Sequence, residues 1–191
     1  MCRAQPDITV LYPCDAVSTE KLVVLMAYHP GPAYIRTSRP KTPVIYSNDE
    51  SFRIGGLKVL RESADDAVTV IGGGVTVFEA LKAYDQLKAA GTSIRVVDLY
   101  SVSPVDREAL VAAGRATGGH LITVEDHYAA GGIGDAVAEA VADAGLTVHR
   151  LAVREIPRSG KSEELLDRFK ISARHIVEAV RAMIAGPAIK D

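Results

Sequence analysis

The sequence predicts an α/β fold, with a mostly parallel sheet covered by helices on both faces and preceded by a partial α/β domain. Segments rich in β-branched residues alternate with helical patterns of about 10–15 residues, as in parallel sheets with right-handed crossovers. The strand expected at residues 68–71 is β-prone throughout, so helices must cover both of its faces. Residues 1–40 supply only a strand, a helix and a strand, which is too little to bury a sheet of their own.

In this partial domain, strands are expected at residues 8–11 and 33–37, with a helix between them at residues 17–28. Asp15 can cap the helix because its carboxylate can accept hydrogen bonds from the first turn. Residues 41–56 are polar, contain Pro and Gly, and show no periodicity. They predict a linker between two domains.

The rest of the chain predicts a complete α/β unit. Strands are expected at residues 57–62, 68–71, 94–99, 120–125 and 147–153, the first of them at a sheet edge. Helices are expected at residues 76–90, 106–117, 131–144, 162–169 and 173–185.

Composition excludes several classes of protein. The net charge is −2 with acids and bases interspersed, so we expect no nucleic-acid partner. No apolar run approaches the roughly 18 residues of a membrane-spanning helix, and we expect no membrane. Cys2 and Cys14 lack metal-ligand spacing and predict a reduced, cytoplasmic protein.

Three glycines, residues 72–74, follow the strand at 68–71 and precede a helix, a corner that can bind an anion. The dinucleotide fingerprint requires a third glycine where this chain has Val77. Asp98 ends the next strand, roughly where a ribose-binding acid is expected. Because the match is partial, a purely structural corner is favoured over nucleotide binding.

A second glycine motif, Ser159-Gly-Lys-Ser162, is similar to the end of a phosphate-binding loop. The complete motif needs glycine at the position of Glu155, whose charge would repel a phosphate. Pro157 removes a backbone N–H as well. A surface loop at the start of a helix is therefore favoured.

Two groups of side chains at expected strand ends are candidates for chemistry. Glu125 and His127 could form an acid–base pair, but without a nearby nucleophile or metal ligand we favour a role in holding the loop over residues 131–134. Arg36 and Arg39 follow the second strand, where a guanidinium suits bidentate capture of a phosphate or carboxylate. Local sequence does not separate this function from a surface ion pair.

Five motifs, in this order, resemble the C-terminal part of transketolase and are most similar to its animal-type branch. They are Tyr12-Pro-Cys-Asp15, Tyr34-Ile-Arg-Thr-Ser-Arg-Pro40, Val68-Thr-Val-Ile-Gly-Gly-Gly74, Val124-Glu-Asp-His-Tyr128 with Gly131-Gly-Ile-Gly134, and Val153-Arg-Glu-Ile-Pro-Arg-Ser-Gly-Lys161. No single motif is specific, but the ordered set is, and the resemblance covers residues 7–185.

This resemblance implies that residues 1–45 are the tail of a pyrimidine-binding domain and that residues 46–191 are the C-terminal domain. The family transfers a two-carbon ketol unit from a ketose phosphate to an aldose phosphate, and its complete members are homodimers. A family arginine that helps to hold sugar-phosphate substrates matches Arg39, whereas Arg36 has no such counterpart. The family binds no nucleotide at the corner formed by residues 72–74.

The resemblance also implies that the complete enzyme uses thiamine diphosphate and a divalent metal, Mg or Ca, and that neither is bound to this chain alone. The family's Gly-Asp-Gly motif and the glutamate that activates the thiamine ring belong to upstream portions. We therefore expect the chain to need the missing N-terminal and pyrimidine-domain portions as partners, and to be inactive by itself. It could be an expressed fragment, a proteolytic product, a split-gene subunit or the product of a misplaced gene start.

Two other hypotheses stay open. The chain could be a stand-alone assembly or ligand-binding module without catalysis. It could also belong to a related thiamine diphosphate enzyme, such as a deoxyxylulose-phosphate synthase or an oxoacid dehydrogenase β-subunit. The motif at residues 34–40 favours transketolase over these related enzymes.

Overall fold

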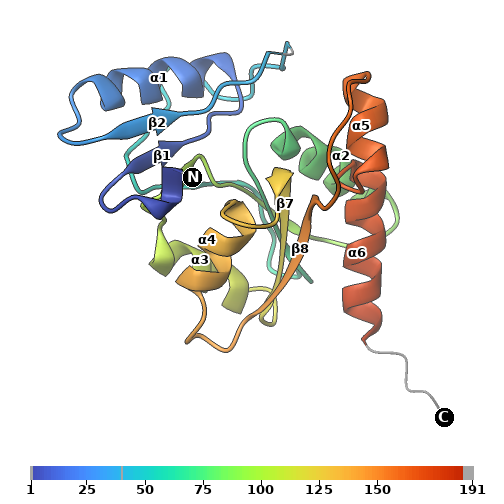
Figure 1. Ribbon diagram of the computed structural model, residues 1–191. Coiled ribbons are helices and arrows are strands. Elements are labelled where there is room, and N and C mark those ends of the chain that lie inside the picture. The colour runs from blue at the N-terminus through green and yellow to red at the C-terminus, as the bar shows by residue number, and fades with distance from the viewer. Residues whose placement is uncertain (1, 40, 187–191) are drawn as a thin grey trace.

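The computed structural model describes residues 2–39 and 41–186, so Pro40 of the second motif and residues 187–191 of the expected C-terminal domain lie outside the described residues. The chain forms two sheets (Figure 1). A three-stranded sheet has the order β2-β1-β6, and a five-stranded sheet has the order β3-β5-β4-β7-β8. The predicted α/β fold class is confirmed.

The N-terminal unit contains η1 (Cys2–Ala4), β1 (Thr9–Leu11), α1 (Ala16–Ala27) and β2 (Ala33–Ile35), with β1 parallel to β2. Asp15 caps α1 as expected. Its Oδ1 accepts a hydrogen bond of 2.8 Å from the N–H of Ser18, and the Ser18 Oγ accepts one of 3.0 Å from the N–H of Asp15. These reciprocal bonds form a capping box, which fixes where the helix begins.

The third strand of the small sheet was not predicted. β6 (Ser101–Ser103) pairs antiparallel with β1, although it comes from the section expected to form the C-terminal domain. Ser-Val-Ser is too short to show a hydrophobic period, so only pairing with β1 makes it a strand. The first residues therefore complete their sheet with a strand from the following section.

The main sheet contains β3 (Lys58–Arg61), β4 (Thr69–Gly72), β5 (Arg95–Asp98), β7 (His120–Tyr128) and β8 (Thr147–Val153). All its neighbouring strands are parallel except β3, an edge strand that runs antiparallel to β5. β7 continues three residues past its expected end, to Tyr128.

The main sheet and the helices after residue 57 form the main unit. Its helices are α2 (Thr76–Ala89), α3 (Arg107–Arg115), α4 (Ile133–Ala140), α5 (Ser162–Arg168) and α6 (Ala173–Ala185). Four of them lie within about two residues of their expected bounds. α4 is shorter than the expected 131–144, because Gly131 has a left-handed φ of 78° and residues 142–145 form a turn.

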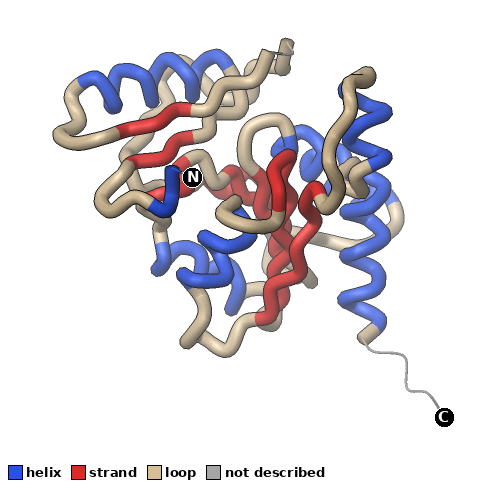
Figure 2. Tube along the Cα trace, viewed as in Figure 1, coloured by secondary structure: helices blue, strands red, loops and turns tan. Residues whose placement is uncertain are grey.

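Helices cover both faces of the main sheet, as predicted. One face packs against α2 and α6, through residues that include Val70, Ile122 and Ile176. The other packs against α3 and α4, with Ile71 and Leu121 in its core. Figure 2 shows the strands in red between these two helical layers.

Residues 41–56 form neither helix nor strand, but they pack closely against both units. Tyr46 is buried, and its ring meets Phe52 edge-on at 5.0 Å between centroids. Phe52 meets Tyr100 in the same way at 5.0 Å. The predicted linker is therefore an ordered seam held by aromatic side chains. The domain boundary near residue 45 stays a prediction.

Candidate functional site

The glycine corner after β4 is filled by protein. A Cβ on Gly74, which has a left-handed φ of 57°, would lie 1.9 Å from Cζ of Tyr12. A Cβ on Gly73 would lie 2.7 Å from Cδ1 of Ile133. The glycines are required because Tyr12 and α4 approach the backbone so closely. This packing supports the structural interpretation of the corner.

The acid that a dinucleotide would require is buried inside the protein. Asp98 has no exposed surface, and its Oδ2 accepts hydrogen bonds from the Tyr46 hydroxyl at 2.7 Å and from Cys14 Sγ at 3.2 Å. Burial raises the pKa of Asp98 to about 7. Because it is enclosed between the two units, Asp98 cannot bind a ribose.

Glu125 has the structural function that was favoured for it. Its carboxylate accepts hydrogen bonds from the N–H groups of Ile133, at 2.7 Å, and Gly134, at 3.0 Å, and so caps α4. Burial raises the pKa of Glu125, and these two bonds oppose that shift. His127 Nδ1 instead donates to the carbonyl of Tyr128 at 2.8 Å, so the two side chains form no acid–base pair.

The glycine loop before α5 is exposed, as expected. Lys161 precedes the helix and pairs with Glu164 at 3.8 Å. Glu155, which replaces the glycine of the phosphate-binding motif, pairs with Arg168 at 3.1 Å. The structure supports a surface loop at this position.

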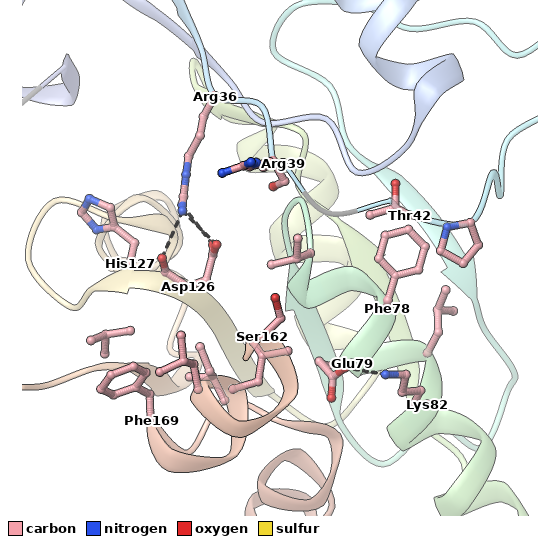
Figure 3. Close-up of a pocket in the computed structure, with 18 of the residues that line it drawn as sticks. Arg36, Arg39, Thr42, Phe78, Glu79, Lys82, Asp126, His127, Ser162 and Phe169 are labelled. Carbon is pink, nitrogen blue, oxygen red and sulfur yellow. Dashed lines mark hydrogen bonds and ion pairs between the residues drawn. The ribbon is translucent and has the colours of Figure 1, made fainter. Parts of the chain in front are cut away.

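The two arginines after β2 have different surroundings (Figure 3). Arg36 makes a bidentate pair with Asp126, with Nη1 3.0 Å from Oδ1 and Nη2 2.8 Å from Oδ2. Its guanidinium carbon also lies 4.6 Å from the centroid of the Tyr12 ring. Arg36 therefore has the ion-paired arrangement that was the alternative to ligand binding.

Arg39 is exposed and has no carboxylate partner within the part of the chain that the structure describes. It lines a cleft of about 1000 Å³ between the segment at residues 36–45 and helices α2 and α5. Figure 3 shows Arg39 between Arg36 and the side chains of Thr42 and Phe78. A guanidinium at this border can meet an anion that enters the cleft.

The walls of this cleft are mainly apolar, with charged groups at its border. The apolar lining residues include Phe78 of α2 and, from α5 and its C-terminal end, Leu165 and Phe169. Lys82 also lines the cleft, but its ammonium already pairs with Glu79 at 2.7 Å. Arg39 is thus better placed than Lys82 or Arg36 to receive a new anionic partner.

The model of the family described as "Transketolase, C-terminal domain" matches residues 55–176. The chain belongs to the transketolase family. It is 52% identical over 185 residues to transketolase-like protein 1 of Bos taurus, covering 96% of this chain and 31% of that protein. It is 50% identical over 185 residues to the transketolase of Homo sapiens, covering 96% and 30%. The chain thus spans about a third of the length of these curated relatives.

Solved structures agree with this assignment. A split-gene transketolase, described as an inactive β4 tetramer, superposes with a TM-score of 0.88 at 36% identity, covering 96% of this chain and 59% of that one. The transketolase of Campylobacter jejuni gives a TM-score of 0.73 at 19% identity, covering 94% and 27%, and shows the fold alone. The family resemblance drawn from the five motifs is confirmed by the family model and by these relatives.

Within residues 2–39 and 41–186, no helix combines the length and apolar character needed to cross a bilayer. In the same ranges, no three His, Cys, Asp or Glu side chains gather in a group that could hold a metal ion.

Sequence reasoning assigned no function to Tyr12 or Asp126, which the structure brings together with Arg36. Tyr12 and Asp126 belong to the quoted motifs and lie at strand ends, and this position was the sequence signal that could have indicated a function for them. Their contact could not be predicted, because 114 positions separate them in the chain.

Proposed function

We propose that this chain is the C-terminal section of a working transketolase, which transfers a two-carbon ketol unit from a ketose phosphate to an aldose phosphate. The observation that carries the proposal is the position of Arg39 at a cleft between the two units, in a chain 50% identical to a transketolase. Family membership by itself leaves the activity open, since transketolase-like proteins are equally similar.

In this proposal, Arg39 binds the phosphate of the sugar substrate. Two parallel N–H groups of a guanidinium match two phosphate oxygens, and the opposite charges strengthen both bonds. The exposed Arg39 is available for this contact, whereas the guanidinium of Arg36 is bound to Asp126. The phosphate is remote from the bond that breaks, so Arg39 contributes substrate binding and orientation.

The proposed complete enzyme uses thiamine diphosphate and a divalent metal, Mg or Ca. The described residues of this chain do not fit the metal, because they offer no cluster of three suitable ligands. We propose that both groups bind to the preceding portions of the complete enzyme, which are the proposed partners of this chain. The cofactor supplies the carbanion chemistry when bound, and this section binds and orients substrate.

We also propose a cytoplasmic homodimer for the complete enzyme. Support for assembly comes from the similar split-gene transketolase, which is described as a tetramer.

The test is to join this section to the preceding portion of the Homo sapiens transketolase, in place of that enzyme's own C-terminal section. We expect this reconstituted enzyme to transfer ketol units between sugar phosphates when thiamine diphosphate and magnesium are supplied. The preceding portion alone is the control. A reconstituted enzyme that folds and binds the cofactor but transfers nothing would contradict the proposal and favour a non-catalytic module.

A further inference from the structure

Four side chains from three strand ends form one polar network beside the cleft. Tyr12 follows β1, Arg36 and Ser38 follow β2, and Asp126 lies near the end of β7. The Tyr12 hydroxyl lies 3.0 Å from Asp126 Oδ2 and 3.2 Å from Ser38 Oγ. Arg36 completes the network with its bidentate pair to Asp126 and a further bond of 3.2 Å to the Asp126 carbonyl.

The network is shielded enough from water to hold its geometry. The Asp126 side chain is 21% exposed and that of Arg36 is 33% exposed, while Tyr12 is buried. Burial and the neighbouring Asp126 raise the pKa of Tyr12 to about 12, so its hydroxyl stays protonated and donates to the carboxylate. Charge-assisted and bidentate bonds are the strongest hydrogen bonds available to these groups.

The network connects the main sheet to the segment at residues 36–39. Asp126 belongs to the main sheet, whereas residues 36–39 continue from the small sheet after β2 ends at Ile35. The N–H of Arg36 donates to the carbonyl of Leu11 at 2.9 Å, and the bonds of Arg36 and Ser38 side chains then hold the segment. Arg39 follows directly after Ser38, so the network determines where the Arg39 backbone lies.

We propose that Asp126 is a positioning residue for substrate phosphate. Through Arg36 and Tyr12, it fixes the segment at residues 36–39 against the main sheet, so that Arg39 is held at the cleft before substrate arrives. A preorganised ligand group avoids the entropy loss of ordering on binding. This inference rests on the proposed function, because it assumes that Arg39 contacts the phosphate.

The first variant is Asp126→Asn in the reconstituted enzyme, which keeps the shape of the side chain and removes its charge. We expect KM for phosphorylated sugars to rise about 2- to 12-fold, the equivalent of one ordinary hydrogen bond. KM for unphosphorylated sugars and kcat should change little. A fall in KM for phosphorylated sugars would overturn the inference. It would mean that Asp126 only neutralises the charge of Arg36, which could otherwise bind the phosphate.

A double-mutant cycle then connects Asp126 to Arg39. If Asp126 acts through Arg39, Asp126→Asn should add almost nothing to the KM of an Arg39→Ala variant. Independent effects of the two substitutions would overturn the positioning function. If Arg39→Ala alone fails to discriminate phosphorylated from unphosphorylated sugars, the proposed phosphate site is wrong, which is a separate outcome.

Tyr12→Phe is the second variant, because it removes only the hydroxyl and leaves the ring on the glycine corner. It should raise the same KM in the same selective way, even if Asp126→Asn fails to fold. Asp143→Asn, which breaks the exposed pair of Asp143 with Arg107 away from the cleft, is the matched control and should leave both KM values unchanged. If Tyr12→Phe changes KM equally for phosphorylated and unphosphorylated sugars, the network only stabilises the fold and the proposed positioning function is wrong.

Discussion

Asp98 makes the stability of this chain depend on pH near neutrality. The carboxyl group is completely buried, and its Oδ1 has no hydrogen-bond partner among the described atoms. Burial raises its pKa from 3.8 to about 7, although the bonds from Tyr46 and Cys14 favour the charged form. The folded protein therefore holds a proton that the unfolded chain releases at a lower pH.

The direction of the pH dependence of stability follows from this difference in pKa between the folded and unfolded states. Because the folded pKa lies above the unfolded one, the stabilisation is complete below about pH 4 and is lost as the pH rises to about 7. The interval between a pKa of 3.8 and one of about 7 corresponds to about 4 kcal/mol of unfolding free energy.

The assay compares the wild-type chain with Asp98→Asn by urea unfolding at a series of pH values from 4 to 8. The asparagine is uncharged throughout, so the wild-type free energy minus that of the variant isolates Asp98 from the other titrating groups. We expect this difference to fall by about 4 kcal/mol as the pH rises, with m unchanged. Tyr46→Phe removes a bond that favours the charged form and should move the fall to higher pH. A difference that stays flat across the series would refute the reasoning.

Three further predictions concern the cleft, the glycine corner and the isolated chain. In the reconstituted enzyme, Arg39→Ala should raise KM for phosphorylated sugars about 10- to 150-fold with little change in melting temperature. Arg36→Ala should lower the melting temperature, because it breaks the pair with Asp126. Identical behaviour of the two variants would contradict the assignment of Arg39. Gly74→Ala should destabilise the chain by about 2–5 kcal/mol in urea unfolding, because the new Cβ would collide with the Tyr12 ring and the residue has a left-handed φ. Millimolar NAD, FAD or ATP should not shift the melting temperature of the wild type. The isolated chain should show no ketol transfer above a blank when thiamine diphosphate and magnesium are supplied, and sustained turnover would disprove this expectation.

Features that depend on neighbouring residues could be predicted from the sequence alone. The Asp15 cap involves residues three positions apart, and the β-prone run before Gly72 forms β4 directly. Hydrophobic periodicity gave the main helices and strands, because burial of one face repeats along each element. The ordered motifs identified the family, since they combine many local constraints.

Tertiary structure decided the contacts between distant residues. β6 became a strand only by pairing with β1, and Asp98 became a buried acid only because Tyr46 and Cys14 close over it. The two arginines at residues 36 and 39 look alike in the sequence. Among the described residues, the structure pairs Arg36 and not Arg39 with Asp126, 90 positions from Arg36, because that carboxylate reaches the end of β2 through the packing of the two sheets.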